Sequence, residues 1–481
     1  MTGYYNFTNT DNAKIVATKL DANGVLQWMK TYSTGTSSTD VGGAILTTAD
    51  GGLALAGTLE LGQVFIMKMD IAGTPEWTKT YDDPGPYGLR LNSNGFVQLA
   101  DGGFALHAGT SLGSENWLML RVDAQGEVLW SDWLGYAGGF PTDVAELPNG
   151  DLVFTGADQG LGNPNLILRK DGLSGATEWM HWYTSGPDHT MAMLGLAVAP
   201  DSTIVVGGYE LGASYHDAFA FAVSSDGTPL WSTRVGTNGI DDGEDIVRAP
   251  NGDYVLCGRL AQDTTNYPLL GGFVARLDAN GQRLWSKHVN IPGTNGFRPI
   301  RCSMADDGGV LMGGYCSTTT YYPQAFMKLD ANGNSCPYCP SSDVGTQESL
   351  SITVAPDQSF AFSGPWATAA DLTFTVADIT GSVTSFSCGS TDVDEPTSAP
   401  DVTIAPNPFA ESAILTLQAA GAPGSARLEI RDLAGRLVHA QQVTGTTTVI
   451  ERGALANGHY IYSAANERGR STRGALQIIG R

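Results

Sequence analysis

The residues with the clearest potential for chemistry are four closely spaced carboxylates. They fall within a short segment, 238–245, that also contains two glycines: Asp241, Asp242, Glu244 and Asp245. Ca²⁺ prefers several oxygen ligands, and a glycine-containing loop lets carboxylates converge on one ion. The order of these acids differs from that of an EF-hand loop. We therefore treat the segment as a candidate calcium site, with a role in a turn as the alternative, and expect no other metal or cofactor.

The histidines and cysteines form no catalytic set that the sequence can identify. Five histidines stand at unrelated positions, so neither a two-histidine metal motif nor a Ser–His–Asp order can be assigned: His107, His181, His189, His216 and His288. Cys336 and Cys339 have the spacing of a metal or redox motif. No second such pair completes a four-cysteine zinc site, and no βαβ pattern surrounds them. We expect a disulfide there, and no catalytic or cofactor-binding residue.

Composition indicates the kind of element that must position any site. Of 481 residues, 42% are hydrophobic, only 16% are charged and 61 are glycine. So much apolar sequence excludes disorder throughout, and abundant glycine with little charge favours short strands joined by tight turns. No run of apolar residues is long enough for a transmembrane helix. The sequence therefore predicts an all-β protein without a transmembrane segment.

The charge is strongly negative and unevenly distributed. The formal net charge is −23, from 26 basic and 49 acidic residues. Residues 402–481 hold eight arginines, no lysine and five acids, which gives +3 and leaves −26 for residues 1–401. A surface this acidic repels phosphate backbones, so we expect no nucleic acid partner.

A tryptophan recurs in one setting about every 50 residues. The six copies are separated by 49, 53, 49, 52 and 54 residues: Trp28, Trp77, Trp130, Trp179, Trp231 and Trp285. Each follows an Asp-x-x-Gly turn, such as Asp123–Gly126, or a variant of it. Asp first and Gly fourth is typical of a type I turn, here at the tip of a hairpin. We assign these tryptophans a structural role, packing between neighbouring repeats.

A second class of turn, such as Asp101-Gly-Gly and Asn251-Gly-Asp, recurs between the hairpins. Four short strands in about 50 residues, repeated along the chain, predict the blades of a β-propeller. Seven complete units are expected between about 41 and 388, and a partial one lies upstream. The fold is thus predicted as a β-propeller of seven or eight four-stranded blades over residues 1–388, with an incomplete first blade. Because no signal peptide is visible, we expect the natural protein to start upstream of Met1.

The last part of the chain differs in composition from the repeats. Residues 389–401 are acidic and rich in proline and serine, as expected of a linker. Residues 402–481 alternate apolar and polar side chains in several short segments. This pattern predicts a second domain, a small β-sandwich.

Three motifs in this tail resemble a known family. They are Pro406-Asn-Pro-Phe409, Asp432-Leu-Ala-Gly-Arg436 and Leu455-Ala-Asn-Gly-His-Tyr460. In this order they are similar to the type A C-terminal sorting domain of the Bacteroidetes type IX secretion system, although the last strand, Arg473–Arg481, is less basic than is usual there. The motif residues to follow in the structure are Pro406, Asn407, Pro408, Asp432, Gly435, Arg436, Leu455, Gly458 and Tyr460.

The resemblance implies an Ig-like sandwich that directs an exported protein across the outer membrane. It implies the secretion machinery as a partner, release or attachment at the cell surface, and an earlier export step through a signal peptide. Cysteines would then meet an oxidising compartment. Cys302 and Cys316, expected on neighbouring strands, are our first choice for a disulfide.

The Asp-x-x-Gly and Trp repeat is also similar to repeats of sialidases and quinoprotein dehydrogenases. The sequence offers neither a matching set of arginines for the first nor an adjacent Cys-Cys pair for the second. We therefore lean away from an enzyme and predict a monomeric extracellular binding or adhesion module for a glycan, protein or polymer. An extracellular hydrolase or lyase, or a purely structural surface protein, are the alternatives.

Overall fold

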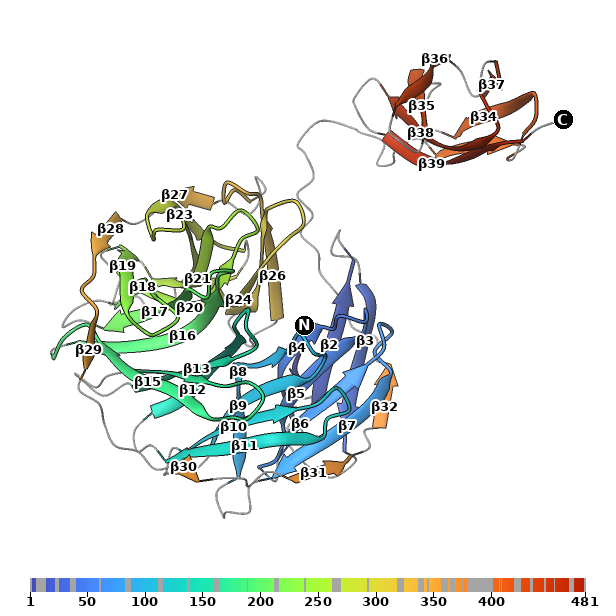
Figure 1. Ribbon diagram of the computed structural model, residues 1–481. Coiled ribbons are helices and arrows are strands. Elements are labelled where there is room, and N and C mark those ends of the chain that lie inside the picture. The colour runs from blue at the N-terminus through green and yellow to red at the C-terminus, as the bar shows by residue number, and fades with distance from the viewer. Residues whose placement is uncertain are drawn as a thin grey trace. The chain divides into compact units, whose positions relative to one another are not determined.

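Every regular element among the described residues is a β-strand, as a computed structural model shows (Figure 1). The chain divides into two compact units, Met1–Cys388 and Gly389–Arg481. The first is a β-propeller and the second a pair of packed sheets, so the predicted all-β propeller and sandwich are confirmed. No helix of the described residues could cross a membrane.

The structure describes residues 2–479 with gaps. The gaps are 6–13, 22–25, 35–39, 60–61, 83–87, 111–115, 136–138, 159–164, 188, 212–215, 238, 262–269, 292–293, 318–323, 336–340, 344–345, 356–361, 364–367, 373–374, 379–400, 406, 408, 419–424, 433–435, 445–446, 454 and 467–470.

The described strands of the first unit form seven blades, the lower of the two predicted numbers. In blades 2 to 6 four consecutive strands pair antiparallel, the first at the centre of the ring and the fourth outermost. Blade 2 is β4 (Val41–Thr47), β5 (Leu53–Thr58), β6 (Val64–Met69) and β7 (Pro75–Asp82). Blade 3 is β8 (Leu89–Gln98), β9 (Phe104–Thr110), β10 (Asn116–Val122) and β11 (Val128–Gly135).

The next three blades repeat this plan. Blade 4 is β12 (Gly139–Glu146), β13 (Leu152–Asp158), β14 (Asn165–Lys170) and β15 (Thr177–Thr184). Blade 5 is β16 (Thr190–Val198), β17 (Ile204–Leu211), β18 (His216–Val223) and β19 (Pro229–Gly236). Blade 6 is β20 (Ile240–Arg248), β21 (Tyr254–Ala261), β22 (Leu270–Leu277) and β23 (Arg283–Val289).

Two blades contain three consecutive strands in the described residues. Blade 1 is β1 (Thr2–Tyr5), β2 (Lys14–Leu20) and β3 (Leu26–Ser33), where β3 carries Trp28 and so corresponds to the outermost strand of the other blades. Blade 7 is β24 (Gly296–Met304), β25 (Val310–Ser317) and β26 (Gln324–Leu329), which correspond to the three inner strands.

Residues 341–378, which we name the edge segment, add one short strand to the rim of six blades. The additions run backwards from blade 6 to blade 1, and each pairs antiparallel with the outermost strand (orange in Figure 1). The pairs are β27 (Ser341–Asp343) with β23, β28 (Thr346–Ser349) with β19, β29 (Thr353–Ala355) with β15, β30 (Phe362–Ser363) with β11, β31 (Thr368–Asp371) with β7, and β32 (Thr375–Asp378) with β3.

The prediction of a further complete blade up to residue 388 is therefore wrong. Strands of the edge segment have two to four residues, against six to ten in blades 2 to 6. Strands that short cannot bury a face of their own. Instead each one pairs with the exposed edge of a blade that is already formed, which also covers an edge otherwise open to aggregation.

Repeated contacts between the hairpin turns and the preceding blade hold the ring together. Trp28 donates from Nε1 to the carbonyl of Ile71 at 3.2 Å, and Trp130 donates to Gly172 at 2.9 Å. Tyrosines four residues on add a second bond, as in Tyr81 to the carbonyl of Gly126 at 2.9 Å. Each of the six repeat tryptophans thus contacts the turn of the next blade.

The second unit consists of two sheets around a core of its own. One contains β33 (Asp401–Ala405), β34 (Ser412–Gln418) and β37 (Thr447–Glu451). The other contains β36 (Leu437–Thr444), β35 (Ser425–Asp432), β38 (Gly458–Asn466) and β39 (Ser471–Ile478). Buried side chains from both sheets, among them Leu415, Leu428 and Leu476, form one cluster.

Candidate functional site

The innermost strands of blades 4 to 7 share a β-bulge, and this bulge builds the site. The register shifts by one residue at the same place in β12, β16, β20 and β24. The extra residues are Thr142, Leu194, Glu244 and Ile300. A bulge re-aims a side chain out of the sheet plane, and here all four line one cavity at the centre of the ring.

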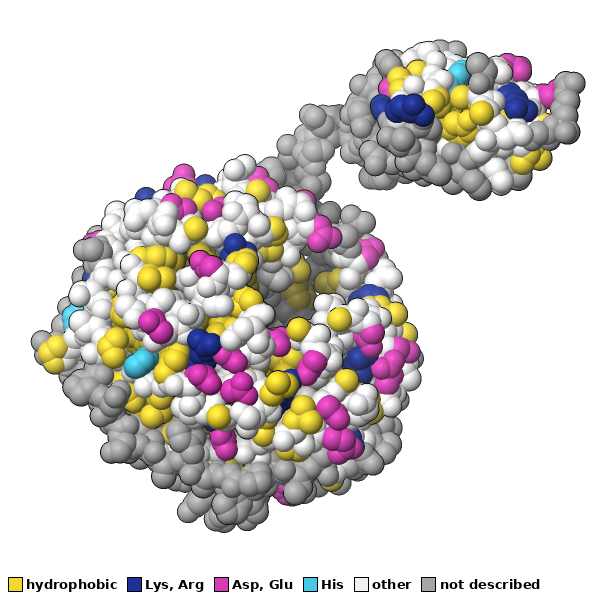
Figure 2. All heavy atoms as spheres, in the orientation of Figure 1, with side chains coloured by type: hydrophobic (Ala, Val, Ile, Leu, Met, Phe, Trp, Pro, Cys, Tyr) yellow, Lys and Arg dark blue, Asp and Glu magenta, His cyan; other side chains and the backbone are white. Residues whose placement is uncertain are grey.

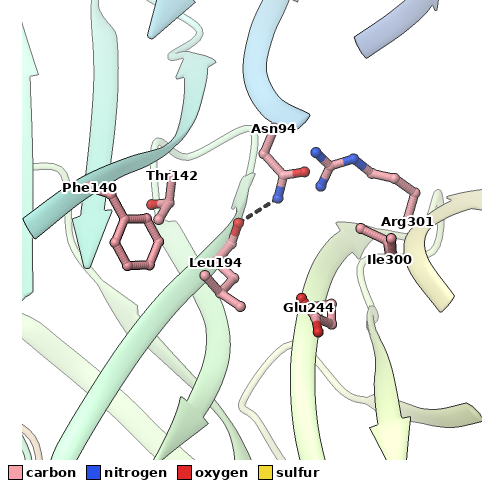
Figure 3. Close-up of a pocket in the computed structure, with 7 residues that line it drawn as sticks. All are labelled: Asn94, Phe140, Thr142, Leu194, Glu244, Ile300 and Arg301. Carbon is pink, nitrogen blue, oxygen red and sulfur yellow. Dashed lines mark hydrogen bonds between the residues drawn. The ribbon is translucent and has the colours of Figure 1, made fainter. Parts of the chain in front are cut away.

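The cavity measures about 180 Å³ and has seven lining residues (Figure 3). Besides the four bulge residues these are Asn94, Phe140 and Arg301. Asn94 comes from β8, where the register also shifts, so the walls derive from five consecutive blades. The volume is below the roughly 300–1,000 Å³ typical of pockets for drug-sized ligands. It suits a single small polar group or one unit of a polymer.

Two polar side chains in the cavity have atoms without a protein partner. Asn94 donates from Nδ2 to the carbonyl of Leu194, which fixes its carboxamide across the ring. Its Oδ1 and the Nη2 of Arg301 are both buried, with no hydrogen bond among the described residues. In Figure 3 these two groups point toward one another across the cavity. One acceptor and one charged donor are therefore available to a ligand, and unpaired buried polar atoms are costly unless something satisfies them.

The carboxylates next to the cavity are mostly engaged. Glu244 accepts from Nε of Arg298 at 3.1 Å, and its pKa is raised by burial, an effect that Arg298 opposes. Asp245 accepts from the backbone N–H of Cys302 at 2.9 Å, and Asp143 accepts from that of Leu196 at 2.8 Å. Burial raises the pKa of both. Each thus joins its blade to the next one.

The four acids of the candidate calcium site lie on β20 but do not converge. Asp241 accepts from the backbone and hydroxyl of Thr237, and burial raises its pKa to about 6. Asp242 bonds His216 Nδ1 at 2.9 Å and Arg259. Within the described residues no group of three or more His, Cys, Asp or Glu could hold a metal ion. Calcium binding stays a prediction here.

The histidines are spread over several blades, and two are paired with acids. His189 contacts Glu210 at 2.7 Å in blade 5, and His216 contacts Asp242 between blades 5 and 6. His107 is fully buried between blades 3 and 4, and burial lowers its pKa to about 3. None of them lines the cavity.

The predicted Cys302–Cys316 disulfide is wrong. The two lie on paired strands, but Cys302 is opposite Met312 and Cys316 is opposite Phe297. An offset of four residues separates them by roughly 13 Å along the strand, well beyond the reach of a disulfide. In this structure both side chains are in the reduced form, as is that of Cys257. Cys336, Cys339 and Cys388 lie outside the described residues.

The motif residues of the tail take several different places in the sandwich. Asn407 accepts from the N–H of Gln477 on β39 at 2.9 Å. Leu455 and Tyr460 are buried in the core, and the Tyr460 hydroxyl donates to the carbonyl of Ala456 at 2.8 Å. Asp432 pairs with Tyr460 in register, Gly458 begins β38, and Arg436 is exposed. Pro406, Pro408 and Gly435 lie outside the described residues.

Of the residues that line the central cavity, Glu244 belongs to the candidate calcium segment, and the sequence did not reveal the others. Asn94, Thr142, Leu194 and Arg301 belong to no motif. One signal was present, because Asp143 and Asp245 occupy the same position of the repeat, directly after the bulge. For Asp245 the sequence indicated only a calcium-binding role or, as the alternative, a role in a turn.

Comparison with known proteins identifies the tail. Residues 403–477 match the family described as Secretion system C-terminal sorting domain. No curated protein matches the chain. Among solved structures, a protein of unknown function from Dyadobacter fermentans has 13% identity and a TM-score of 0.41, covering 59% of this chain and 92% of that one.

Two further structures are similarly distant. A europium-containing methanol dehydrogenase has 12% identity and a TM-score of 0.39, over 69% of this chain and 75% of that one. PorZ, a surface component of the type IX secretion system of Porphyromonas gingivalis, has 11% identity and a TM-score of 0.19, over 99% and 85%. Likeness at this level carries no argument about activity. The sorting domain instead indicates the location: this chain is a propeller that is secreted or attached to the outer cell surface.

Proposed function

We propose that the propeller is an extracellular binding module whose central cavity takes one polar unit of a glycan or related polymer. The observation that carries the proposal is the pair of polar atoms, Asn94 Oδ1 and Arg301 Nη2, that face the cavity and have no hydrogen-bond partner in the described part of the chain. A hydroxyl-bearing unit can donate to the amide oxygen and accept from the guanidinium. The apolar side chains of Phe140 and Ile300 offer surface to the carbon skeleton.

The local charge favours a neutral or weakly acidic ligand. Arg301 lies 4.0 Å from Asp245, and Glu244 is paired with Arg298, so acids and bases balance around the cavity. The acidic side chains elsewhere are dispersed over the face of the propeller seen in Figure 2 rather than gathered in one patch. A strongly anionic ligand would have to approach through a field of like charge.

Thermal melting of the full chain against a panel of neutral and acidic soluble polysaccharides tests the proposal. A ligand at 100 times its Kd that binds only the folded state adds about 2.7 kcal/mol, which is readily seen as a raised midpoint. Replacing Arg301 with Ala removes the charged donor and lowers affinity roughly ten- to a hundredfold. Lys328→Gln, at the outer end of blade 7, is the control and leaves the shift unchanged.

An extracellular hydrolase or lyase is the second candidate. It is favoured by one observation, the raised pKa of the Glu244 carboxyl beside the cavity, since general acids are commonly tuned in this way. Release of new reducing ends from the same panel, lost in Glu244→Gln, would support this activity. No shift and no release with any polysaccharide would leave a structural or protein-binding role.

A further inference from the structure

The buried interface between blades 6 and 7 contains two neighbouring cysteines. Cys257 lies on β21 and Cys302 on β24, and both lie beside Asp245: Cys257 is opposite Asp245 in the strand pair, and Cys302 Sγ is 3.9 Å from the carbonyl oxygen of Asp245. Cys302 Sγ is also 3.7 Å from the carbonyl of Val255, two residues before Cys257 on the same strand. Cys257 is completely buried and Cys302 is 7% exposed. The two belong to one core cluster.

The backbone holds these side chains in place from both sides. Asp245, opposite Cys257 in the antiparallel pair of β20 and β21, accepts from the N–H of Cys302. This bond fixes β24 against blade 6 at the position of the cysteine. Cys316, in the same cluster, has no such relation to a second cysteine among the described residues.

We infer that Cys257 and Cys302 form a disulfide between blades 6 and 7 in the exported protein. Two facts support the bond besides this proximity. The sorting domain places the chain in an oxidising environment, where neighbouring thiols are oxidised and stay so. In addition, blade 7 has three strands in the described residues and receives no strand from the described part of the edge segment. A covalent link would fasten this blade to its neighbour.

The oxidation needs an acceptor for two electrons, which a disulfide-bearing oxidoreductase of the export compartment supplies. One cysteine thiolate attacks the disulfide of the oxidoreductase, forming a mixed disulfide and releasing one of its thiols. The second cysteine then attacks the mixed disulfide, which forms the Cys257–Cys302 bond and releases the fully reduced oxidoreductase. The two protons end on its two sulfurs.

The order of events follows from burial. The pKa of Cys257 is raised by burial, and that of Cys302 is raised by the Cys257 contact and by burial, so neither is a thiolate in the closed interface. Because the thiolate is the reactive form, the exchange takes place before blade 7 closes against blade 6. Once formed, the bond is shielded from reductants.

Peptide mapping of the full chain, recovered from the medium or cell surface, tests the inference. Free thiols are alkylated in denaturant without reductant, and the chain is then cut with trypsin. Cys257 falls in peptide 249–259, and Cys302 and Cys316 fall together in peptide 302–328. The expected product is these two peptides cross-linked, lighter by two hydrogens than their sum, and separated by reduction.

The Cys316→Ser variant removes the remaining ambiguity. The cross-link persists in this variant, which assigns it to Cys302, and disappears in Cys257→Ala. Reduction also lowers the melting midpoint of the wild type more than that of Cys257→Ala. Alkylated Cys257 and Cys302 in the secreted protein, or a cross-link of either to another cysteine, would overturn the inference.

Discussion

At the scale of single residues, the propeller depends on turn glycines that leave room for a tryptophan of the preceding blade. The turn glycine of each later blade has a positive φ and lies against the indole ring or its neighbours from the preceding blade. At Gly281 φ is 78°, and an added Cβ would lie 2.3 Å from Trp231. The Asp-x-x-Gly motif is therefore a docking surface for the tryptophan as well as a turn.

Gly281→Ala tests both roles of the turn glycine, which are its left-handed backbone and its close contact with Trp231. We expect it to cost about 1–2 kcal/mol for the left-handed backbone and a further 1–3 kcal/mol for the clash with Trp231. Gly51→Ala is the matched control, because φ is 85° there and nothing lies within 4 Å of the added Cβ. Urea unfolding measures both variants. Equal losses of unfolding free energy in the two variants would mean that Trp231 can move away from the added Cβ at no cost.

His107 gives the propeller a sensitivity to acid. Its ring contacts the carbonyl of Asp143 and is enclosed by Trp117 and Phe154, with centroids 5.4 and 5.1 Å away. The folded pKa is about 3, against 6.5 for an ordinary histidine. Between these values the unfolded chain binds a proton that the folded chain does not. Stability from this group is thus complete above pH 6.5 and is lost as the pH falls toward 3.

His107→Gln tests this dependence. The wild type loses up to about 3 kcal/mol more than the variant when the pH falls from 6.5 to 4, by the 1.36 kcal/mol that each pKa unit represents. Chemical unfolding at several pH values gives the difference. The comparison is made between the two proteins because buried carboxyls such as Asp241, with a raised pKa, act in the opposite direction. Parallel pH profiles would contradict the assignment.

At the scale of elements, the edge segment joins blades that otherwise meet through side chains. Gln347 on β28 illustrates this. Its amide nitrogen donates to Thr233 of blade 5 at 2.8 Å and to the carbonyl of Gly281 of blade 6 at 3.1 Å. Its oxygen accepts from the N–H of Arg283 at 2.8 Å. One side chain thus links two blades.

Gln347→Ala is expected to lower the free energy of unfolding by roughly 1–3 kcal/mol, because it leaves partly buried groups on two blades without partners. Glu348→Ala on the same strand is the control. The side chain of Glu348 is 64% exposed, and its carboxylate lies 3.6 Å from Arg234, which is a long ion pair that is open to solvent at Glu348. Its loss therefore costs less than about 1 kcal/mol. Urea unfolding distinguishes the two. An equal, small effect would show that β28 adds main-chain bonds only.

The elements were predictable from the sequence to the extent that they repeat. The tryptophan period and both turn classes predicted the hairpins of β2–β3 through β22–β23 and the order of strands in a blade. The edge segment was misassigned because it also consists of successive short strands, and a pattern along the sequence does not say whether strands pair with one another or with distant partners. The cavity was missed since a bulge depends on pairing register, which is a property of two strands together.

At the scale of the whole molecule, export and the proposed binding belong to separate units. The sandwich has its own buried core, and the propeller completes its blades without it. We therefore expect a chain ending at Cys388 to fold but to remain inside the outer membrane of a cell with an active type IX secretion system. Cell fractionation, with protease resistance of the retained propeller as the test of folding, measures this.

A point variant tests the role of the sorting domain in export without removing that domain. Asn407→Ala breaks the bond to the backbone of Gln477, which anchors the entry of the chain to β39. We expect less protein at the surface or in the medium and an unchanged propeller. Arg431→Gln, half-exposed and outside the motifs, is the control and is exported normally. Normal export of the chain ending at Cys388 would contradict the role of the sorting domain. Failure of both variants to yield a protease-resistant propeller would instead show that the two units fold together.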